Sequence, residues 1–360
     1  MYDRLVVLPT GRPSDGSPGT PPADRSGRHD YVVFGGCFRS EIAFPELRRA
    51  RRGAATWTLR RSTDSAALVG AELLGEEEVY ERVSVRLYHS AAGYRLEYTD
   101  TGCFDVSPTG SEIVWHPGHS PDIEAARIDV LGRVFATALH ASGLSVLHAS
   151  AVAIDGTAIA FLAPRVYGKS TVAMAMLDAG AQLVTDDILA VEPDVPVRAW
   201  PGVQSVRLWD DSADRIVGHA LLKTVGTYPA PRRDGKSAGD APAALTKQVL
   251  GRLPQRKLTH GRVPLGAIYL ILPVEADGNV AAARRVPVSP VRAALAIVAH
   301  SKLGPLLGKA AAQVVFDRAV RVARAVPVYT LMIARDLARI GDVARDIAEW
   351  HRPSASVASG

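Results

Sequence analysis

The chain has 360 residues, a formal net charge of +5 and 47% hydrophobic residues, a composition that favours a folded protein with a sizeable core and two domains. It contains no run of about 18 apolar residues, so the sequence predicts no transmembrane helix and no membrane contact. Two cysteines, Cys37 and Cys103, are too few for a disulfide framework, and the N-terminus lacks a signal-peptide core, so we expect a cytoplasmic protein.

The first part of the chain predicts a β-rich domain over residues 1–122. Residues 8–29 are rich in Pro, Gly, Ser and Asp. Such a segment buries too little apolar surface to offset its ordering entropy, so we expect a flexible loop there. Between Tyr31 and Pro117 short apolar runs alternate with turn residues. The runs RVSVRLYHS, GYRLEYTD and SEIVWHPG are typical of short strands.

The second part predicts an α/β domain over residues 123–352, followed by a tail at 353–360. Residues 123–142 carry apolar side chains at helical spacing. The stretches LSVLHASAVAID, GTAIAFLAP, AQLVTDDILAVEP, PLGAIYLILPV and VPVYTLMIA predict strands. Helices are predicted for STVAMAMLDAG, SPVRAALAIVAHSKL, AAAQVVFDRAVRVARA and DLARIGDVARDIAEW. An alternation of this kind is typical of an α/β core.

The most informative stretch runs from Ala163 to Ser170 and matches a phosphate-binding loop, with Ala163 in place of the usual first glycine. Gly168 lets successive backbone N–H groups turn toward one anion, and the helix that follows adds its N-terminal dipole. Lys169 is placed to reach the β- and γ-phosphates, and the Ser170 hydroxyl is a hard oxygen ligand for Mg²⁺. The predicted nucleotide-binding residues are Ala163, Pro164, Arg165, Val166, Tyr167, Gly168, Lys169, Ser170 and Thr171.

Two alternatives stay open at this loop. The whole stretch could be an ordinary glycine turn before a helix, with Lys169 solvated. Arg165 either adds a phosphate contact or is solvated.

An acidic pair, Asp186 and Asp187, comes one predicted helix after the loop. Carboxylates at the end of a strand beside a phosphate loop face the nucleotide crevice of an α/β sheet. One can hold Mg²⁺ while the other accepts a proton from an attacking hydroxyl, although aspartates also cap turns. We favour Asp186 as the base and Asp187 as the metal ligand together with Ser170, and the reverse order stays open. A lone histidine in an apolar strand, such as His148, is more often structural.

Residues 147–193, LHASAVAIDGTAIAFLAPRVYGKSTVAMAMLDAGAQLVTDDILAVEP, resemble the catalytic core of bacterial HPr kinase/phosphorylase. The shared pieces are a histidine-containing strand, a phosphate loop and a Thr-Asp-Asp strand, in the same order and spacing. The C-terminal half, with PGVQSVRLWDDS, PLGAIYLI and VPVYTLMIARDL, is more similar to the HPr-kinase-like proteins found beside peptide-modifying and lasso-peptide genes.

The resemblance implies a P-loop kinase core of the type shared with phosphoenolpyruvate carboxykinase, with ATP and Mg²⁺ as cofactors. It implies that Lys169 and Ser170 bind phosphates and Mg²⁺, and that Asp186 and Asp187 divide the roles of base and metal ligand. It also places His148 near the transferred phosphoryl group. The stretch WPGVQSVRLWDD lacks the family's Glu-Xaa-Arg-Gly signature, so the resemblance does not extend to HPr as substrate or to the phosphorylase reaction.

Arg207, about 20 residues beyond the acidic pair, is a further candidate catalytic residue because phosphoryl transfer needs positive charge around the transferred group. The segment 225–244 collects Pro, Gly and basic residues, and we expect it to be mobile until an anionic ligand binds. The alternative is that Arg207 forms an ordinary salt bridge and that the segment 225–244 is a solvated surface loop.

The predicted function is transfer of the γ-phosphoryl group of ATP to a hydroxyl, with a serine of a peptide or protein as acceptor. A kinase for a small-molecule hydroxyl compound, such as an amino acid or sugar, is one alternative. A nucleotide-binding regulatory protein without catalysis is another. No basic stripe interleaved with aromatics occurs, so we expect no nucleic-acid partner. The choice between ATP and GTP and the oligomeric state, including a homo-oligomer, stay open.

Overall fold

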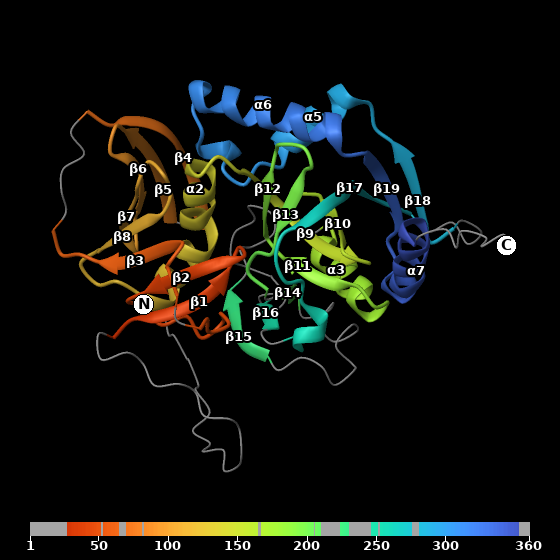
Figure 1. Ribbon diagram of the computed structural model, residues 1–360, viewed down its shortest axis with the longest axis horizontal. Helices are drawn as coiled ribbons and strands as arrows, with labels where there is room; N and C mark the ends of the chain where they lie inside the picture. Colours follow the sequence, from red (N-terminus) through yellow and green to blue (C-terminus); the bar gives the residue numbers. More distant parts are fainter. Residues whose placement is uncertain are drawn as a thin grey trace, which may run out of the picture.

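Two large β-sheets dominate the protein, and Figure 1 shows them side by side. The computed structural model describes residues 27–51, 53–64, 70–80, 83–164, 167–204, 206–209, 224–229, 246–250, 253–275 and 281–352. Within these ranges the chain is a mixed α/β protein, as the sequence predicts, with two eight-stranded sheets and one three-stranded sheet. The predicted loop at 8–29 is described only from residue 27, and the predicted tail at 353–360 lies outside the described residues.

The first sheet has the strand order β1-β2-β3-β8-β7-β6-β5-β4. Its strands are β1 (His29–Val33), β2 (Gly36–Ser40), β3 (Trp57–Arg61), β4 (Glu72–Tyr80), β5 (Val83–Ser90), β6 (Gly93–Tyr98), β7 (Gly102–Val106) and β8 (Glu112–Pro117). The strands β5, β6 and β8 confirm the three runs predicted from the alternation of apolar residues. Pairing is antiparallel throughout except at β2–β3 and β3–β8, which are parallel.

A helical segment covers the apolar face of this sheet. The sequence predicts one helix over residues 123–142, but the structure divides it into α1 (Ile123–Asp129), a π-helical turn η1 (Val130–Val134) and α2 (Phe135–Ala141). The break lies at Gly132, whose φ of −101° and ψ of −112° are not helical. Phe135 packs edge-on against Phe38 and Trp57, with ring centroids 4.8 and 5.9 Å apart. This segment packs on the first sheet and leads into the second sheet. The domain boundary that the sequence predicts at residue 122 stays a prediction.

The second sheet has the order β10-β9-β12-β13-β17-β19-β18, with β11 paired to β9. Its strands are β9 (Ser145–Ile154), β10 (Thr157–Leu162), β11 (Gln182–Thr185), β12 (Ile188–Glu192), β13 (Arg198–Trp200), β17 (Val263–Val274), β18 (Ala283–Pro287) and β19 (Val328–Ala334). Because β10 also pairs with β17, five of these strands close into a ring. The stretch AQLVTDDILAVEP forms two strands, because the chain turns at Asp186 and Asp187 between β11 and β12. The two aspartates therefore follow the end of a strand, as the sequence predicts.

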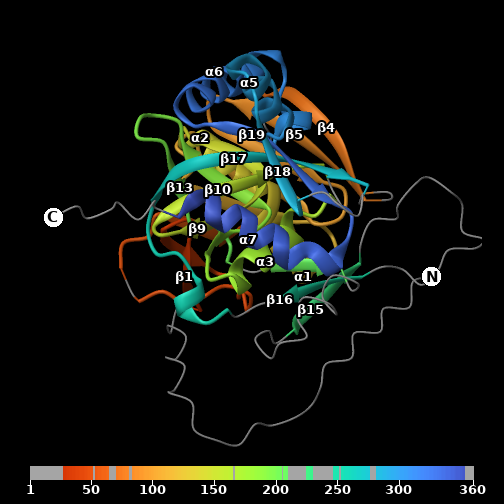
Figure 2. The same cartoon turned by 90° about the vertical axis from the view of Figure 1, so that its right-hand side faces the viewer.

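Helices cover both faces of the second sheet. The helices are α3 (Lys169–Asp178), α5 (Pro290–Ala299), α6 (Lys309–Ala325) and α7 (Ile340–His351). On one face α3 and α7 pack together in one apolar cluster, and Figure 2 shows α7 in front of α3. On the other face α5 and α6 belong to a second cluster and run along the top of Figure 1. Of the described helices, none combines the length and the hydropathy needed to cross a membrane.

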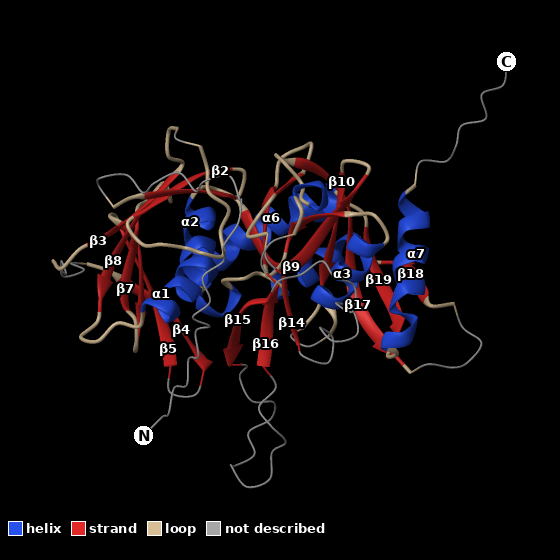
Figure 3. Ribbon diagram, turned by 90° about the horizontal axis from the view of Figure 1, so that it is seen from below, coloured by secondary structure: helices blue, strands red, loops and turns tan. Residues whose placement is uncertain are grey.

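The third sheet is small and has the order β14-β16-β15. Its strands are β14 (Val206–Trp209), β15 (Thr224–Pro229) and β16 (Thr246–Leu250), and they lie between the two large sheets in Figures 1 and 3. The start of the predicted mobile segment 225–244 is therefore a strand, and residues 230–244 lie outside the described residues.

Candidate active site

The predicted phosphate loop connects the end of β10 to the start of α3. Gly168 lies at the N-cap of α3 with φ of +89°, a left-handed conformation that glycine adopts without strain. The Gly168 carbonyl accepts the first helical hydrogen bond, from the Val172 N–H over 2.8 Å. Arg165 and Val166 lie outside the described residues. The sequence pattern of strand, loop and helix is therefore present, and the N-terminus of a ten-residue helix follows the loop directly.

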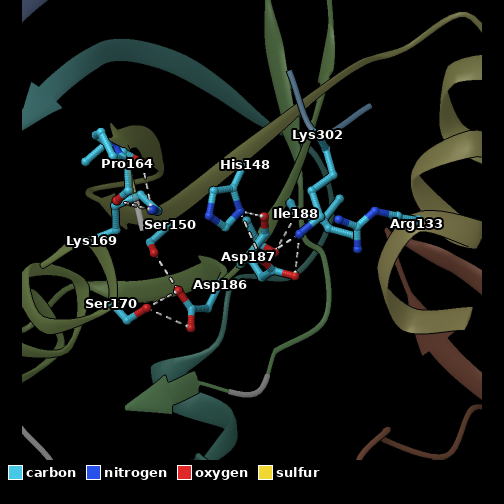
Figure 4. Close-up of polar contacts among 12 residues, drawn as sticks. Arg133, His148, Ser150, Pro164, Lys169, Ser170, Asp186, Asp187, Ile188 and Lys302 are labelled. Atoms are coloured by element: carbon cyan, nitrogen blue, oxygen red, sulfur yellow. Dashed lines mark hydrogen bonds and ion pairs between the residues drawn. The ribbon is translucent and has the colours of Figure 1, made fainter. Parts of the chain in front are cut away.

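Lys169 points into the loop and is only 8% exposed. Its Nζ donates to the carbonyl oxygens of Ala163 and Pro164 over 2.8 and 3.1 Å, as Figure 4 shows. The backbone at the start of the loop thus holds the ammonium group of Lys169. Thr171 is buried in the first turn of α3, whereas Tyr167 is exposed.

Asp186 directly follows β11 and lies beside Ser170 and below Ser150 in Figure 4. Its carboxylate accepts hydrogen bonds from the Ser170 hydroxyl at 2.9 Å (Oδ1) and 3.1 Å (Oδ2), and from the Ser150 hydroxyl at 2.5 Å. Asp186 is only 6% exposed and Ser150 is fully buried. A buried carboxylate and two hydroxyls therefore join β9, β11 and α3.

Asp187 has different surroundings. Its backbone has φ of +83°, which is uncommon outside glycine, and the Thr185 hydroxyl closes the turn by donating to the Ile188 carbonyl over 2.7 Å. The Asp187 Oδ1 lies 3.0 Å from Nδ1 of His148. Lys302 donates to both carboxylate oxygens, over 2.8 and 2.9 Å. Asp187 thus lies between an imidazole and an ammonium group.

Close packing on the other side of this turn requires a second glycine. Gly202 donates its N–H to the Val184 carbonyl over 2.9 Å, and a Cβ at this position would lie 2.2 Å from the Thr185 hydroxyl oxygen. Gly202 therefore lets the chain pass directly behind the turn that carries the two aspartates.

The surroundings of His148 and His300 lower the pKa of both imidazoles and so favour their uncharged form. Burial is the main cause that lowers the pKa of His148, and the nearby Lys302 adds to it, while Asp187 opposes it. The pKa of His300 is lowered to about 4, mainly by burial and further by Lys169 and His148. The site therefore holds two neutral imidazoles among its lysines and carboxylates.

The helical segment that packs on the first sheet also reaches this site, through Arg133 of η1. Its guanidinium forms a two-pronged ion pair with Glu77 of β4, over 3.0 and 2.6 Å, and interacts electrostatically with Asp187. Figure 4 shows Arg133 beyond Lys302, on the side away from the phosphate loop.

Of the predicted catalytic residues, the structure brings His148, Asp186 and Asp187 together with Lys169 and Ser170. Arg207 lies in β14, with its backbone paired to Val249, and its catalytic role stays a prediction. Three residues near the aspartates were not predicted as site residues: Ser150, Lys302 and Arg133. In the described part of the chain, no group of three or more His, Cys, Asp or Glu is arranged to hold a metal ion.

Comparisons with known proteins give little. No family model matches the sequence, and no curated protein matches it. Among solved structures, the Hpr(Ser) kinase/phosphatase from Coxiella burnetii is similar at a TM-score of 0.26 and 11% sequence identity, covering 57% of this chain and 97% of that one. A likeness this weak supports no conclusion about fold or function.

Proposed function

We propose that the protein is a phosphotransferase that uses ATP and Mg²⁺ to phosphorylate a hydroxyl group, with a serine of a peptide or protein as the acceptor. The observation that carries the proposal is the hydrogen bond between Ser170 and Asp186, 2.9 Å long. It joins the first turn after the phosphate loop to the turn that holds both carboxylates. A phosphate bound at the loop would therefore lie beside two aspartates with different surroundings, as a phosphoryl-transfer site requires.

The loop supplies the nucleotide half of the site. The N-terminus of α3 presents a positive dipole end to an anion bound at the loop. The Lys169 ammonium, held by two backbone carbonyls, is available to exchange those neutral acceptors for charged phosphate oxygens. These donors bind the phosphates and not the nucleotide base, so they do not distinguish ATP from GTP. The choice between the two nucleotides is left to a binding experiment.

Ser170 and Asp186 form a donor set that fits Mg²⁺. Both offer hard oxygen atoms, they are already in contact, and Mg²⁺ is usually held by one or two protein oxygens together with substrate phosphates and water. When bound, the ion would neutralise charge on the phosphates. Sequence alone favoured Asp187 as the metal ligand and Asp186 as the base. The contact with Ser170 favours the reverse order, which we adopt here.

Asp187 is then the residue that accepts the proton of the acceptor hydroxyl. Its carboxylate is 27% exposed, so an acceptor can approach it. His148 holds the carboxylate from the β9 side, and because its ring is neutral it donates through Nδ1 without adding charge. In this arrangement Lys169 binds phosphate, Ser170 and Asp186 hold the ion, and Asp187 removes the proton.

The test is a transfer assay with Mg²⁺ and ATP labelled in the γ-phosphoryl group, run against a peptide library and a panel of small hydroxyl compounds. Mass spectrometry should find a new phosphoester on a peptide serine, and Lys169→Met should abolish it. Arg321→Met is the matched control, because it removes a surface ion pair with Asp194 far from the loop. Transfer to small molecules alone would identify a small-molecule kinase, and nucleotide binding without any transfer would identify a regulatory protein.

A further inference from the structure

Lys302 reaches the candidate active site from the turn that follows α5. The sequence predicts helix through SPVRAALAIVAHSKL, but α5 ends at Ala299. The next residues pair with β9: the His148 N–H donates to the His300 carbonyl over 2.8 Å, and the Lys302 N–H donates to the Val146 carbonyl over 2.9 Å. An isolated bridge between Leu147 and Ser301 lies between these bonds. The strand that carries His148 therefore also fixes the backbone of Lys302.

The ammonium group of Lys302 is directed at one carboxylate. Its Nζ lies 2.8 and 2.9 Å from the two oxygens of Asp187, and its side chain is only 12% exposed. Figure 4 shows it on the face of Asp187 that is away from Lys169. A long flexible side chain loses rotamer entropy when it is held this way, so the contact has to be favourable enough to offset that cost.

We propose that Lys302 is a positioning residue for phosphoryl transfer, which acts through Asp187 by orienting its carboxylate and offsetting its charge. The inference rests on the function proposed above and adds a residue to its mechanism.

The physical need for such a residue follows from charge. A bound nucleotide would bring several negative charges close to Asp186 and Asp187, and like charges repel strongly at short range in a partly buried site. Lys169 and a metal ion offset charge on the phosphate side. Lys302 offsets it on the acceptor side, where its contact with both oxygens also fixes the plane of the carboxylate.

The backbone of Asp187 supports the same inference. A non-glycine residue at φ of +83° is strained, and such strain persists where the surroundings hold the residue firmly. His148 and Lys302 both contact the Asp187 carboxylate. An ion pair that only tied the turn after α5 to the turn between β11 and β12 would not need to involve a residue in this conformation.

The experiment is a double-mutant cycle in the transfer assay, using Lys302→Met, Asp187→Asn and the two combined. Lys302→Met should lower kcat roughly tenfold to a hundredfold, in line with the loss of a hydrogen bond to a charged group, while KM for ATP changes little. On the Asp187→Asn background the same substitution should cost no more than about threefold, because its partner is already absent. Lys302→Arg should recover most of the rate.

Thermal melting and calorimetric ATP binding are measured on every variant, with Arg321→Met as the control for loss of a surface ion pair. A Lys302→Met protein with a lower Tm but the wild-type kcat would overturn the inference, since Lys302 would then contribute to stability only. Equal losses in both backgrounds would overturn it too, because Lys302 would not act through Asp187. Both results would leave the proposed function intact. A wild-type protein that binds no nucleotide would overturn the function and the inference together.

Discussion

Ser170 donates its hydroxyl hydrogen to the carboxylate of Asp186 over 2.9 Å, and so connects the first turn of α3 to the end of β11. The two residues are 16 positions apart, a separation that spans α3, the turn after it and strand β11. This contact distinguishes the two aspartates, because Asp187, the next residue, turns toward His148 and Lys302 instead.

The first prediction concerns the hydroxyl at position 170. Ser170→Ala removes the donor to Asp186 and one of the two proposed metal oxygens, so the Mg²⁺ concentration needed for half-maximal transfer should rise roughly tenfold or more. Ser170→Thr keeps the hydroxyl and should stay close to wild type. The measurement is a Mg²⁺ titration of the transfer rate. Identical titration curves for the alanine variant and the wild type would show that Ser170 is not a metal ligand.

The aspartates should respond differently to amide substitution. Asp187→Asn should lower kcat by roughly two orders of magnitude with ATP affinity little changed, because a proton acceptor acts in the transition state. Asp186→Asn should instead raise the Mg²⁺ requirement. Steady-state kinetics at several Mg²⁺ concentrations separates the two effects. If the two phenotypes were exchanged, Asp186 would be the base and Asp187 the metal ligand, the order that sequence alone favoured.

Gly168 provides a test of the loop's backbone. No atom lies within 4 Å of a Cβ built at this position, so Gly168→Ala is opposed only by its φ of +89°. The left-handed conformation costs a non-glycine residue about 1–2 kcal/mol, and the variant should lose stability and nucleotide affinity accordingly. Gly341→Ala is the matched control, because this glycine also has open space but lies in α7 at a negative φ. The control should gain about 0.5–1 kcal/mol in denaturant unfolding. Equal outcomes at both positions would show that Gly168 is not held in this conformation.

A buried carboxyl next to η1 should make stability depend on pH. The pKa of Asp129 is raised from 3.8 to about 7, mainly by burial and to a smaller extent by Asp100, while the hydroxyl of Thr101 and the Arg133 guanidinium oppose the shift. The folded protein then keeps a proton that the unfolded chain has released, so this contribution to stability is lost as the pH rises from about 4 to about 7.

Asp129→Asn cannot ionise, so above about pH 7 it should be more stable than wild type by about 1 kcal/mol or more, or roughly 2–4 °C in Tm. The advantage should shrink as the pH falls toward about 4. Melting curves across this range give the comparison. A constant difference between the two proteins at every pH would mean that Asp129 does not titrate as its burial requires.

Local pattern was enough to predict the parts of the site that are close in sequence. The apolar strand before Ala163, the glycine at 168 and the apolar helix after it predicted the order of β10, loop and α3. Ser150 could also have been found, because it lies two residues after His148 and side chains two apart share one face of a strand. Within residues 123–142, the one sequence signal for the π-helical turn was Gly132. An isolated glycine makes a regular helix less favourable but does not predict a π-helical turn.

Lys302 could not have been found this way. Lys302 is 115 positions from Asp187 in the sequence. Its position in the fold depends on the pairing of residues 300–302 with β9, and no local sequence pattern predicts that pairing. The stretch after Ala299 lacks glycine or proline until Gly304, so the helical pattern continues past the point where the helix ends. Arg133 was hidden for a similar reason, since its ion pair joins it to Glu77, 56 positions earlier.

The most direct measurement of the central claim is a calorimetric titration of the wild-type protein with Mg-ATP, beside Lys169→Met and Arg321→Met. The account predicts one nucleotide site in the wild type and in the surface control. It predicts at least a tenfold loss of affinity in Lys169→Met, because a hydrogen bond to a charged group contributes about 1.5–3 kcal/mol. A wild-type protein that binds neither Mg-ATP nor Mg-GTP, or a Lys169→Met variant that binds as tightly as the wild type, would contradict it.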